Sequence, residues 1–236
     1  MPDIKVLERI AGIMRTWRPK TCFANLSQGS QGTLTDIGDT VTKGTYTSDS
    51  TGFEQFLNGE TPGPHEFISS DAAFKRYTVH QEYVPSLRDF GEFRVYITTT
   101  ESPKSPSKRG LKVERALRTT WVECGKELYM HATAIGENDR WGDYLELTPD
   151  LLFKYALKVY RLLLAEKKPL LRSLLIGGRL DIGIDLSGKG FFVNELTRIT
   201  NADIFSEETE PKPHDHVCKA FARALDEVFP APPKST

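Results

Sequence analysis

The stretch that most constrains this chain is residues 176–206, which predicts a β-hairpin with one acidic residue on each strand. Asp181 lies in the segment RLDIGI, Glu195 lies in FFVNELTR, and SGKG (187–190) supplies the turn between them. Hard cations such as Mg²⁺ bind one or two carboxylates together with the phosphates of a nucleotide. The hairpin is therefore a candidate metal site.

Strict alternation along the two strands predicts which side chains share a face. On the first strand, Asp181 points away from Leu180 and Ile182. On the second strand, the same rule places Glu195 on the face of Val193. An acid among apolar neighbours needs a partner, because an unpaired buried charge is costly.

A structural role for the two acids is the alternative to a metal site. Arg179 and Arg198 flank the hairpin acids and could pair with them on a solvated sheet face. Structural ion pairs are common in proteins, so spacing alone leaves both hypotheses open.

Composition bounds the class of protein. The chain has 236 residues, 39% of them hydrophobic, and a formal net charge of −1, so no net field favours nucleic acid or an acidic membrane. Its three cysteines, Cys22, Cys124 and Cys218, are too few and too far apart for a disulfide framework. The N-terminus MPDIKVLERIAG does not resemble a signal peptide, and no apolar run reaches the roughly 20 residues of a membrane span. We expect a cytoplasmic protein without nucleic-acid or membrane partners.

Apolar periodicity and turn residues predict an α+β fold with antiparallel sheets. The expected elements, in chain order, are a helix at 3–17, a strand at 21–26, a Gly-rich loop at 27–39, a short helix at 51–59, strands at 74–84, 92–100, 115–124 and 126–135, a helix at 149–167, the acidic hairpin at 178–197 and a helix at 213–228. The composition of residues 101–114 predicts a mobile loop, and residues 230–236 predict a disordered tail.

Two further stretches could contribute to a nucleotide site. In QEYVPSLRDFGEFRVYI (81–97), extended backbone before Pro85 could hold an adenine edge while Arg94 reaches phosphates, or the segment could be a plain hairpin with Arg94 on its surface. In SQGSQGT (27–33), Ser30 and Gly32 could let backbone N–H groups approach phosphate oxygens, although such residues also occur in ordinary surface loops.

Taken in this order, the three stretches resemble the ATP-grasp superfamily. QEYV followed by GEFRVYI is similar to the hinge and arginine strand of the glutathione-synthetase and ribosomal-protein-modification ligase branches, and RLD followed by NEL is similar to the metal pair of the D-alanine ligase branch. The resemblance implies two small α+β subdomains, 1–80 and 81–229, whose antiparallel sheets enclose a nucleotide cleft.

The resemblance also implies roles for individual residues. The adenine pocket would be lined by Gln81, Glu82, Tyr83 and Val84. The phosphates and the acyl-phosphate intermediate would contact Arg94 and Arg179, and Mg²⁺ would be held by Asp181, Glu195 and Thr197. The implied reaction activates a small-molecule or peptide carboxylate with ATP for attack by an amine or a similar nucleophile.

The chain departs from the family pattern in three places. The strand before the Gly-rich loop carries Asn25 near the position where the family usually has a lysine, and Thr197 occupies a position that favours asparagine. The chain also begins almost directly at the nucleotide-binding part, so the usual N-terminal domain is expected on a partner chain or not at all. These departures motivate a second hypothesis, a degenerate module that binds a nucleotide or a partner protein without ligation. A third is an unrelated α+β binding protein whose acids form structural ion pairs.

Overall fold

A computed structural model describes residues 2–24, 40–44, 54–56, 78–100, 110–124, 127–141, 144, 146–199 and 213–229. Its helices are α1 (Pro2–Met14), α2 (Pro85–Asp89), α3 (Pro149–Ala165), the 3₁₀ helix η1 (Pro169–Leu175) and α4 (Pro213–Val228). Its strands are β1 (Thr21–Ala24), β2 (Thr40–Gly44), β3 (Glu54–Phe56), β4 (Thr78–Glu82), β5 (Glu92–Thr100), β6 (Gly110–Cys124), β7 (Glu127–Ala134), β8 (Gly177–Ile184) and β9 (Phe191–Arg198).

The chain forms two compact units, and one is inserted in the other. The first unit comprises Pro19–Pro85, and the second comprises Pro2–Arg18 together with Ser86–Thr236. Helix α1 thus belongs to the second unit, whereas the expected division at 80/81 placed it in the first. The physical reason is burial: Val6, Leu7 and Ile10 are at most 2% exposed and belong to the main apolar core of the second unit.

The first unit contains a four-stranded antiparallel sheet in the order β1-β4-β2-β3. The predicted short helix at 51–59 is wrong for its central residues, because Glu54–Phe56 pair with Thr40–Thr42 as strand β3. Pairing with a neighbouring strand overrides the local helical preference of this short segment.

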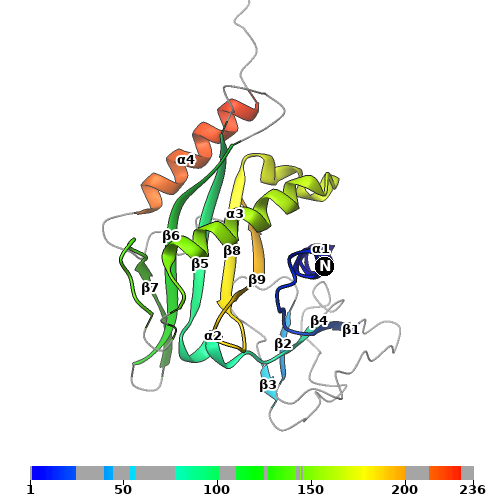
Figure 1. Cartoon of the computed structure of the whole chain (residues 1–236), viewed down its shortest axis with the longest axis vertical. Coiled ribbons are helices and arrows are strands. Elements are labelled where there is room, and N and C mark those ends of the chain that lie inside the picture. The colour runs from blue at the N-terminus through cyan, green and yellow to red at the C-terminus, as the bar shows by residue number, and fades with distance from the viewer. Residues whose placement is uncertain are drawn as a thin grey trace, which may run out of the picture. The chain divides into compact units, whose positions relative to one another are not determined.

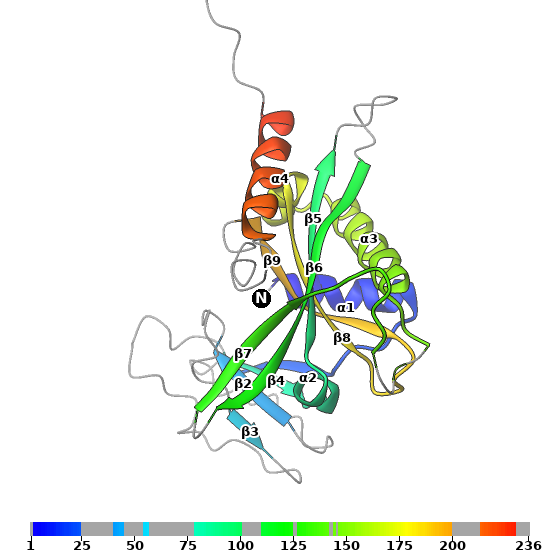
Figure 2. The same ribbon diagram turned by 90° about the vertical axis from the view of Figure 1, so that its left-hand side faces the viewer.

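The second unit is built on a five-stranded antiparallel sheet in the order β7-β6-β5-β8-β9. Helix α3 covers one face, where its Leu152, Ala156 and Val159 pack into the main core (Figure 1). Helix α4 lies on the opposite side of the sheet, where Val217 and Phe221 pack in a second, smaller core (Figure 2). The α+β class with antiparallel sheets is therefore confirmed.

Several predicted boundaries agree with the structure and others do not. Thr148 caps α3 as expected, since its side chain accepts a hydrogen bond from the backbone N–H of Leu151. The predicted mobile loop at 101–114 is wrong for residues 110–114, which form the start of β6, and residues 110–113 pair with β5. Residues 101–109 and 230–236 lie outside the described residues. Within the described ranges, no helix combines the length and apolarity that a membrane span requires.

Candidate functional site

The charged residues of the acidic hairpin meet Arg94 on one face of the second unit's sheet. Strand β5 turns Phe93, Val95 and Ile97 into the main apolar core, so alternation turns Arg94 to the other face. Residues Arg94 and Asp181 are direct partners in the β5–β8 register. The prediction that Arg94 could lie on the surface of a plain hairpin is wrong, because its side chain is only 7% exposed.

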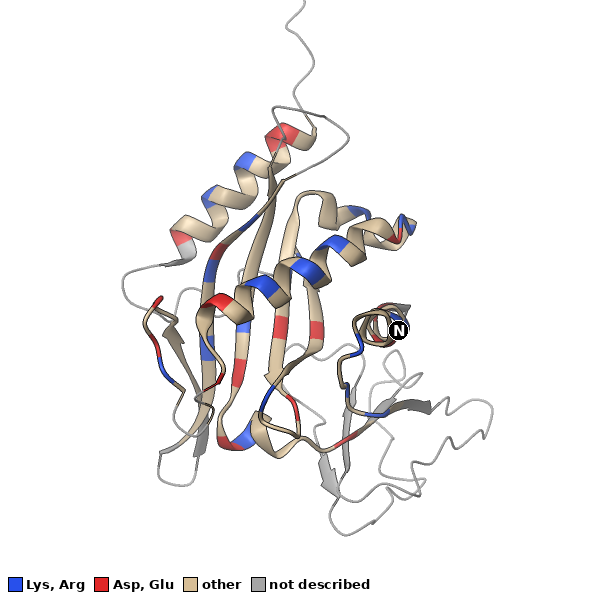
Figure 3. Cartoon of the chain, viewed as in Figure 1, with Lys and Arg blue, Asp and Glu red and all other residues tan. Residues whose placement is uncertain are grey.

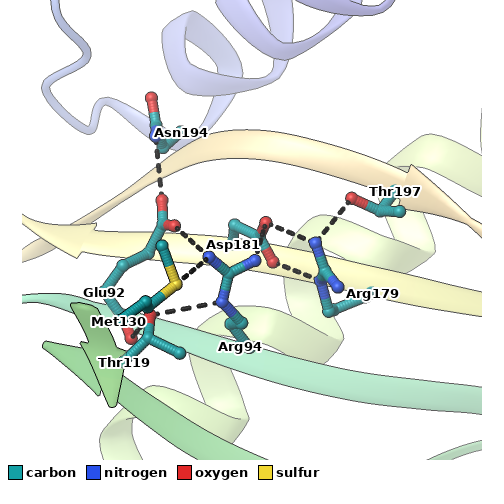
Figure 4. A network of polar contacts seen from close by, with 8 residues as sticks. All are labelled: Glu92, Arg94, Thr119, Met130, Arg179, Asp181, Asn194 and Thr197. Atoms are coloured by element: carbon teal, nitrogen blue, oxygen red, sulfur yellow. Dashed lines mark hydrogen bonds and ion pairs between the residues drawn. The ribbon is translucent and has the colours of Figure 1, made fainter. Parts of the chain in front are cut away.

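Asp181 is the centre of this group of charges. Its side chain is 1% exposed and accepts hydrogen bonds from two arginines (Figure 4). Arg94 Nη1 lies 3.1 Å from Oδ2, while Arg179 Nε and Nη2 lie 2.7 Å from Oδ1 and 2.9 Å from Oδ2. Buried charges are tolerated when they are paired and hydrogen-bonded in this way. The expected ion pair between Asp181 and Arg179 is present, although the sheet face that carries it is buried and not solvated, and Arg198 binds Asp3 instead.

The same contacts keep Arg179 positively charged. Burial alone would lower the pKa of the Arg179 guanidinium, but the negative charge of Asp181 and its hydrogen bonds outweigh burial and raise that pKa. Burial also raises the pKa of the neighbouring Tyr96 hydroxyl, so that phenol stays neutral. The Arg179 guanidinium therefore keeps its positive charge at any pH near neutrality.

Glu195 is the second acid of the hairpin and lies directly opposite Asp181 in the β8–β9 register. Figure 3 shows acidic positions side by side on these two strands. The prediction that Glu195 shares the face of Val193 is wrong, because the register shifts between the pairs Asp181–Glu195 and Ile182–Val193. The extra residue, Asn194, forms a β-bulge that turns Glu195 to the face of Asp181.

The two acids of the hairpin differ in their surroundings. Glu195 is exposed, and its carboxylate has no hydrogen-bond or ion-pair partner among the described residues. Thr197, the third expected ligand, accepts a hydrogen bond of 3.2 Å from Arg179 Nη2. The described residues contain no group of three or more His, Cys, Asp or Glu arranged to hold a metal. One free and one buried carboxylate still suit Mg²⁺, which keeps several waters and takes substrate phosphates as ligands.

Glu92 is a member of this site that the sequence analysis missed. Asn194 Nδ2 donates to its Oε1 over 2.8 Å, and Arg94 Nη2 lies 3.6 Å from its Oε2. Burial first, and then the negative charge of Asp181, raises the pKa of Glu92 to about 7. The alternation of Glu92 with Arg94 in GEFRVY was the signal that could have found it.

Arg94 has further support from the neighbouring strands. Its Nε donates to Thr119 Oγ1 over 3.2 Å, and its Nη2 lies 3.4 Å from Met130 Sδ. These contacts from β6 and β7 hold the guanidinium in one orientation. The fork geometry of arginine makes such fixed, multiple contacts possible.

The expected adenine-binding residues lie in the first unit. Gln81 is buried and donates to Thr21 Oγ1, and Val84 is 2% exposed. The backbone N–H of Glu82 donates to Lys20 O, so this donor is already paired within the unit. Tyr83 is partly buried and directly follows β4. Ser30 and Gly32 lie outside the described residues, and so does Asn25.

Comparison with known proteins identifies the fold. No protein-family model and no curated protein sequence matches the chain. Among solved structures, the chain is similar to D-cycloserine synthetase DcsG with 15% sequence identity and a TM-score of 0.60, over 95% of this chain and 69% of that one. It is also similar to the D-alanine–D-alanine ligase of Bacillus anthracis, with 13% identity and a TM-score of 0.51, over 95% of this chain and 68% of that one. The chain therefore has the ATP-grasp fold.

Proposed function

We propose that this protein is an ATP- and Mg²⁺-dependent ligase that activates a carboxylate as an acyl phosphate for attack by an amine or a similar nucleophile. One observation carries the proposal: in a chain with the ATP-grasp fold, Arg94, Arg179, Asp181 and Glu195 gather on one sheet face. Two fixed positive charges beside two carboxylates suit the transfer of a phosphoryl group, which needs charge stabilisation more than covalent chemistry.

The proposal assigns the metal to the two hairpin acids. Asp181 and Glu195 would hold Mg²⁺, with the hydroxyl of Thr197 as a neutral oxygen nearby. When bound, Mg²⁺ neutralises negative charge on the nucleotide phosphates. Glu195 is the proposed ligand whose carboxylate is most available to a metal ion, because it is exposed and has no partner among the described residues.

The two arginines would stabilise negative charge during transfer. A substrate carboxylate oxygen would attack the γ-phosphorus, the bond to the bridging oxygen would break, and ADP would leave. Arg94 and Arg179 would stabilise the charge on the transferred group, because Asp181 holds both guanidiniums in place before the reaction. A nucleophile would then attack the acyl carbon and phosphate would leave.

The remaining roles come from the sequence and stay predictions. Gln81, Glu82, Tyr83 and Val84 would line the adenine pocket, and the segment that contains Ser30 and Gly32 would cover the phosphates. The acceptor would be a small-molecule or peptide carboxylate, and a partner chain would complete the acceptor site. The cytoplasmic location is likewise a prediction.

The test is ligand-dependent stability. ATP should raise the Tm of the wild-type protein in the presence of Mg²⁺, by the equivalent of about 2.7 kcal/mol at a hundredfold excess over Kd. Glu195→Gln should abolish this effect without changing the Tm of the free protein, because the Glu195 carboxylate has no partner among the described residues. Glu137→Gln, at another exposed position, is the matched control. Failure of ATP to stabilise the wild type under any metal condition would refute the proposal.

A degenerate nucleotide-binding module is the second candidate, and one structural observation favours it. Both arginines already pair with Asp181, and their side chains are only 6–7% exposed. The family's usual lysine position, near Asn25, holds no lysine in this sequence, which supports the same view. ATP hydrolysis or ligation by the isolated chain, lost in Glu195→Gln, would exclude this candidate. The third hypothesis, an unrelated binding protein, would be favoured by Asp181 and Glu195 on opposite sheet faces or too far apart to share an ion, whereas they are direct register partners on one face.

A further inference from the structure

The β-bulge at Asn194 determines where Glu195 points. Val193 pairs with Ile182 and Leu196 pairs with Leu180, so both apolar residues of β9 face the main core. They are three positions apart, which strict alternation cannot place on one face. The extra residue between them resets the alternation, and Glu195 consequently joins the face of Asp181.

Arg18 contacts the backbone of this bulge directly. Its Nε donates to Val193 O over 3.2 Å, and its Nη2 donates to Asn194 O over 3.3 Å. These are two successive carbonyls, the first before the extra residue and the second on it. A planar guanidinium can donate to two such acceptors at once from a fixed fork, whereas an ammonium group is a point donor on a flexible stem.

The bulge is also held through its side chain. Asn194 Nδ2 donates to Glu92 Oε1 over 2.8 Å, on the face that carries Arg94 and Asp181. The peptide groups of the bulge are thus fixed by Arg18, and its side chain is fixed by Glu92. Pro19, the residue after Arg18, is where the chain enters the first unit.

Arg18 is partly buried, which argues against a loose surface contact between its side chain and the bulge. Desolvation lowers the pKa of Arg18 to about 10, so its guanidinium remains charged at neutral pH but is stabilised less than it would be in water. Its Nη1 is buried without a hydrogen-bond partner among the described residues. A partly buried cation with an unpaired donor is unfavourable by itself, and the two bonds to the bulge, together with the negative charge of Glu8, offset that cost.

We infer that Arg18 is a positioning residue for the Glu195 carboxylate, acting through the bulge at Asn194. The inference rests on the proposed function insofar as Glu195 is a magnesium ligand. Partners that orient metal ligands typically change metal affinity by about 10–100-fold when they are removed. A purely structural role for Arg18, as an anchor of the N-terminal segment on β9, would instead change stability alone.

The test uses Arg18→Lys and Arg18→Gln, with Arg198→Gln as the matched control. Arg198 is the last residue of β9, donates to a backbone carbonyl (Leu170 O, 3.2 Å) and pairs with α1 through Asp3, but it lies four residues beyond Asn194. Arg18→Lys keeps the charge and is the variant that should fold best. The first readout is amide hydrogen exchange across residues 193–196, which needs no ligand. We expect exchange there to be about tenfold faster in both Arg18 variants than in Arg198→Gln.

The second readout is the Mg²⁺ concentration that half-saturates the ATP-induced rise in Tm. It should increase about tenfold in Arg18→Lys and stay within about twofold of wild type in Arg198→Gln. The inference would be overturned if the Arg18 variants exchanged amide hydrogens at the same rate as Arg198→Gln. It would also be overturned if their exchange were faster while the half-saturating Mg²⁺ concentration stayed at the wild-type value. If ATP and Mg²⁺ do not stabilise even the wild type, the proposed function fails, and the exchange measurement still decides whether Arg18 holds the bulge.

Discussion

The two faces of the five-stranded sheet are made by the same strands and have opposite chemistry. On one face, Val95 and Leu180 pack under α3 with no exposed surface. On the other, their sequence neighbours Arg94 and Asp181 form a charged group that is also buried. The comparison teaches that the apolar face fixes the backbone, and the fixed backbone then places the charges. A site built on paired strands is more precise than one built on loops.

The largest expected effect comes from removing the central charge. Asp181→Ala leaves two buried guanidiniums without their counter-charge, and we expect it to destabilise the protein by about 4 kcal/mol in urea denaturation. If Arg94, Arg179 and Asp181 were all replaced by apolar residues of similar size, the charged face would become apolar like the face under α3. That triple variant should regain most of the lost stability while showing no response to ATP. A triple variant as unstable as Asp181→Ala would contradict this view of the charged face.

A slightly smaller effect is expected on the apolar face. Leu180→Ala removes a fully buried side chain, and its expected cost is about 3 kcal/mol of unfolding free energy. Because the charged residues are untouched, the folded variant should keep its Mg²⁺-dependent response to ATP in a thermal shift assay. Loss of that response in folded protein would show that the two faces are not independent.

Deleting Asn194 tests the place on β9 where the alternation of the two faces is reset. Without this residue, regular alternation still places Val193 opposite Ile182 and Glu195 opposite Asp181. We expect a loss of about 1 kcal/mol, mainly from the missing hydrogen bond to Glu92, with the Mg²⁺ response retained. In this background, Arg18→Lys should no longer change the Mg²⁺ requirement, since the bulge that it holds is gone.

The smallest expected effect is a change in how steeply the Tm depends on pH. Glu92 has its pKa raised to about 7 in the folded protein from an ordinary value of 4.5, so the folded state binds a proton more tightly than the unfolded state. Its contribution to stability is complete below about pH 4.5 and is lost as the pH rises through about 7. Glu92→Gln should therefore flatten the fall in Tm between pH 5 and 8. An unchanged slope would mean that another group titrates in this range.

Alternation predicted one strand of the acidic hairpin well and the other poorly. The faces of Leu180, Asp181 and Ile182 follow directly from period two. The face of Glu195 does not, because the spacing of three between Val193 and Leu196 requires a bulge. That spacing is present in the sequence, yet only pairing with β8 shows which residue is extra.

Long-range contacts explain the other differences between prediction and structure. The pairing of Asp181 with Arg94 needs a register between strands that brings together residues 87 positions apart in the chain, which composition does not encode. The short strand β3 exists because β2 lies beside it, although its local sequence predicts a helix. The long, amphipathic helix α3 was predicted closely, since its cap and apolar stripe are local signals.

The chain passes between the two units twice, after Arg18 and before Ser86, and contacts of these two residues bear on the order of folding. Arg18, before the first crossing, binds β9, and Ser86, after the second, donates to Ile184 O at the end of β8. These contacts span 175 and 98 residues, so they close very long loops and should form late. During synthesis, the first unit is made before the β8–β9 hairpin, and the residues that flank this unit in the chain, Arg18 and Ser86, both bind that hairpin. We therefore expect the second unit to complete folding only after β9 has been made, with the last strand of the sheet locking the first helix in place.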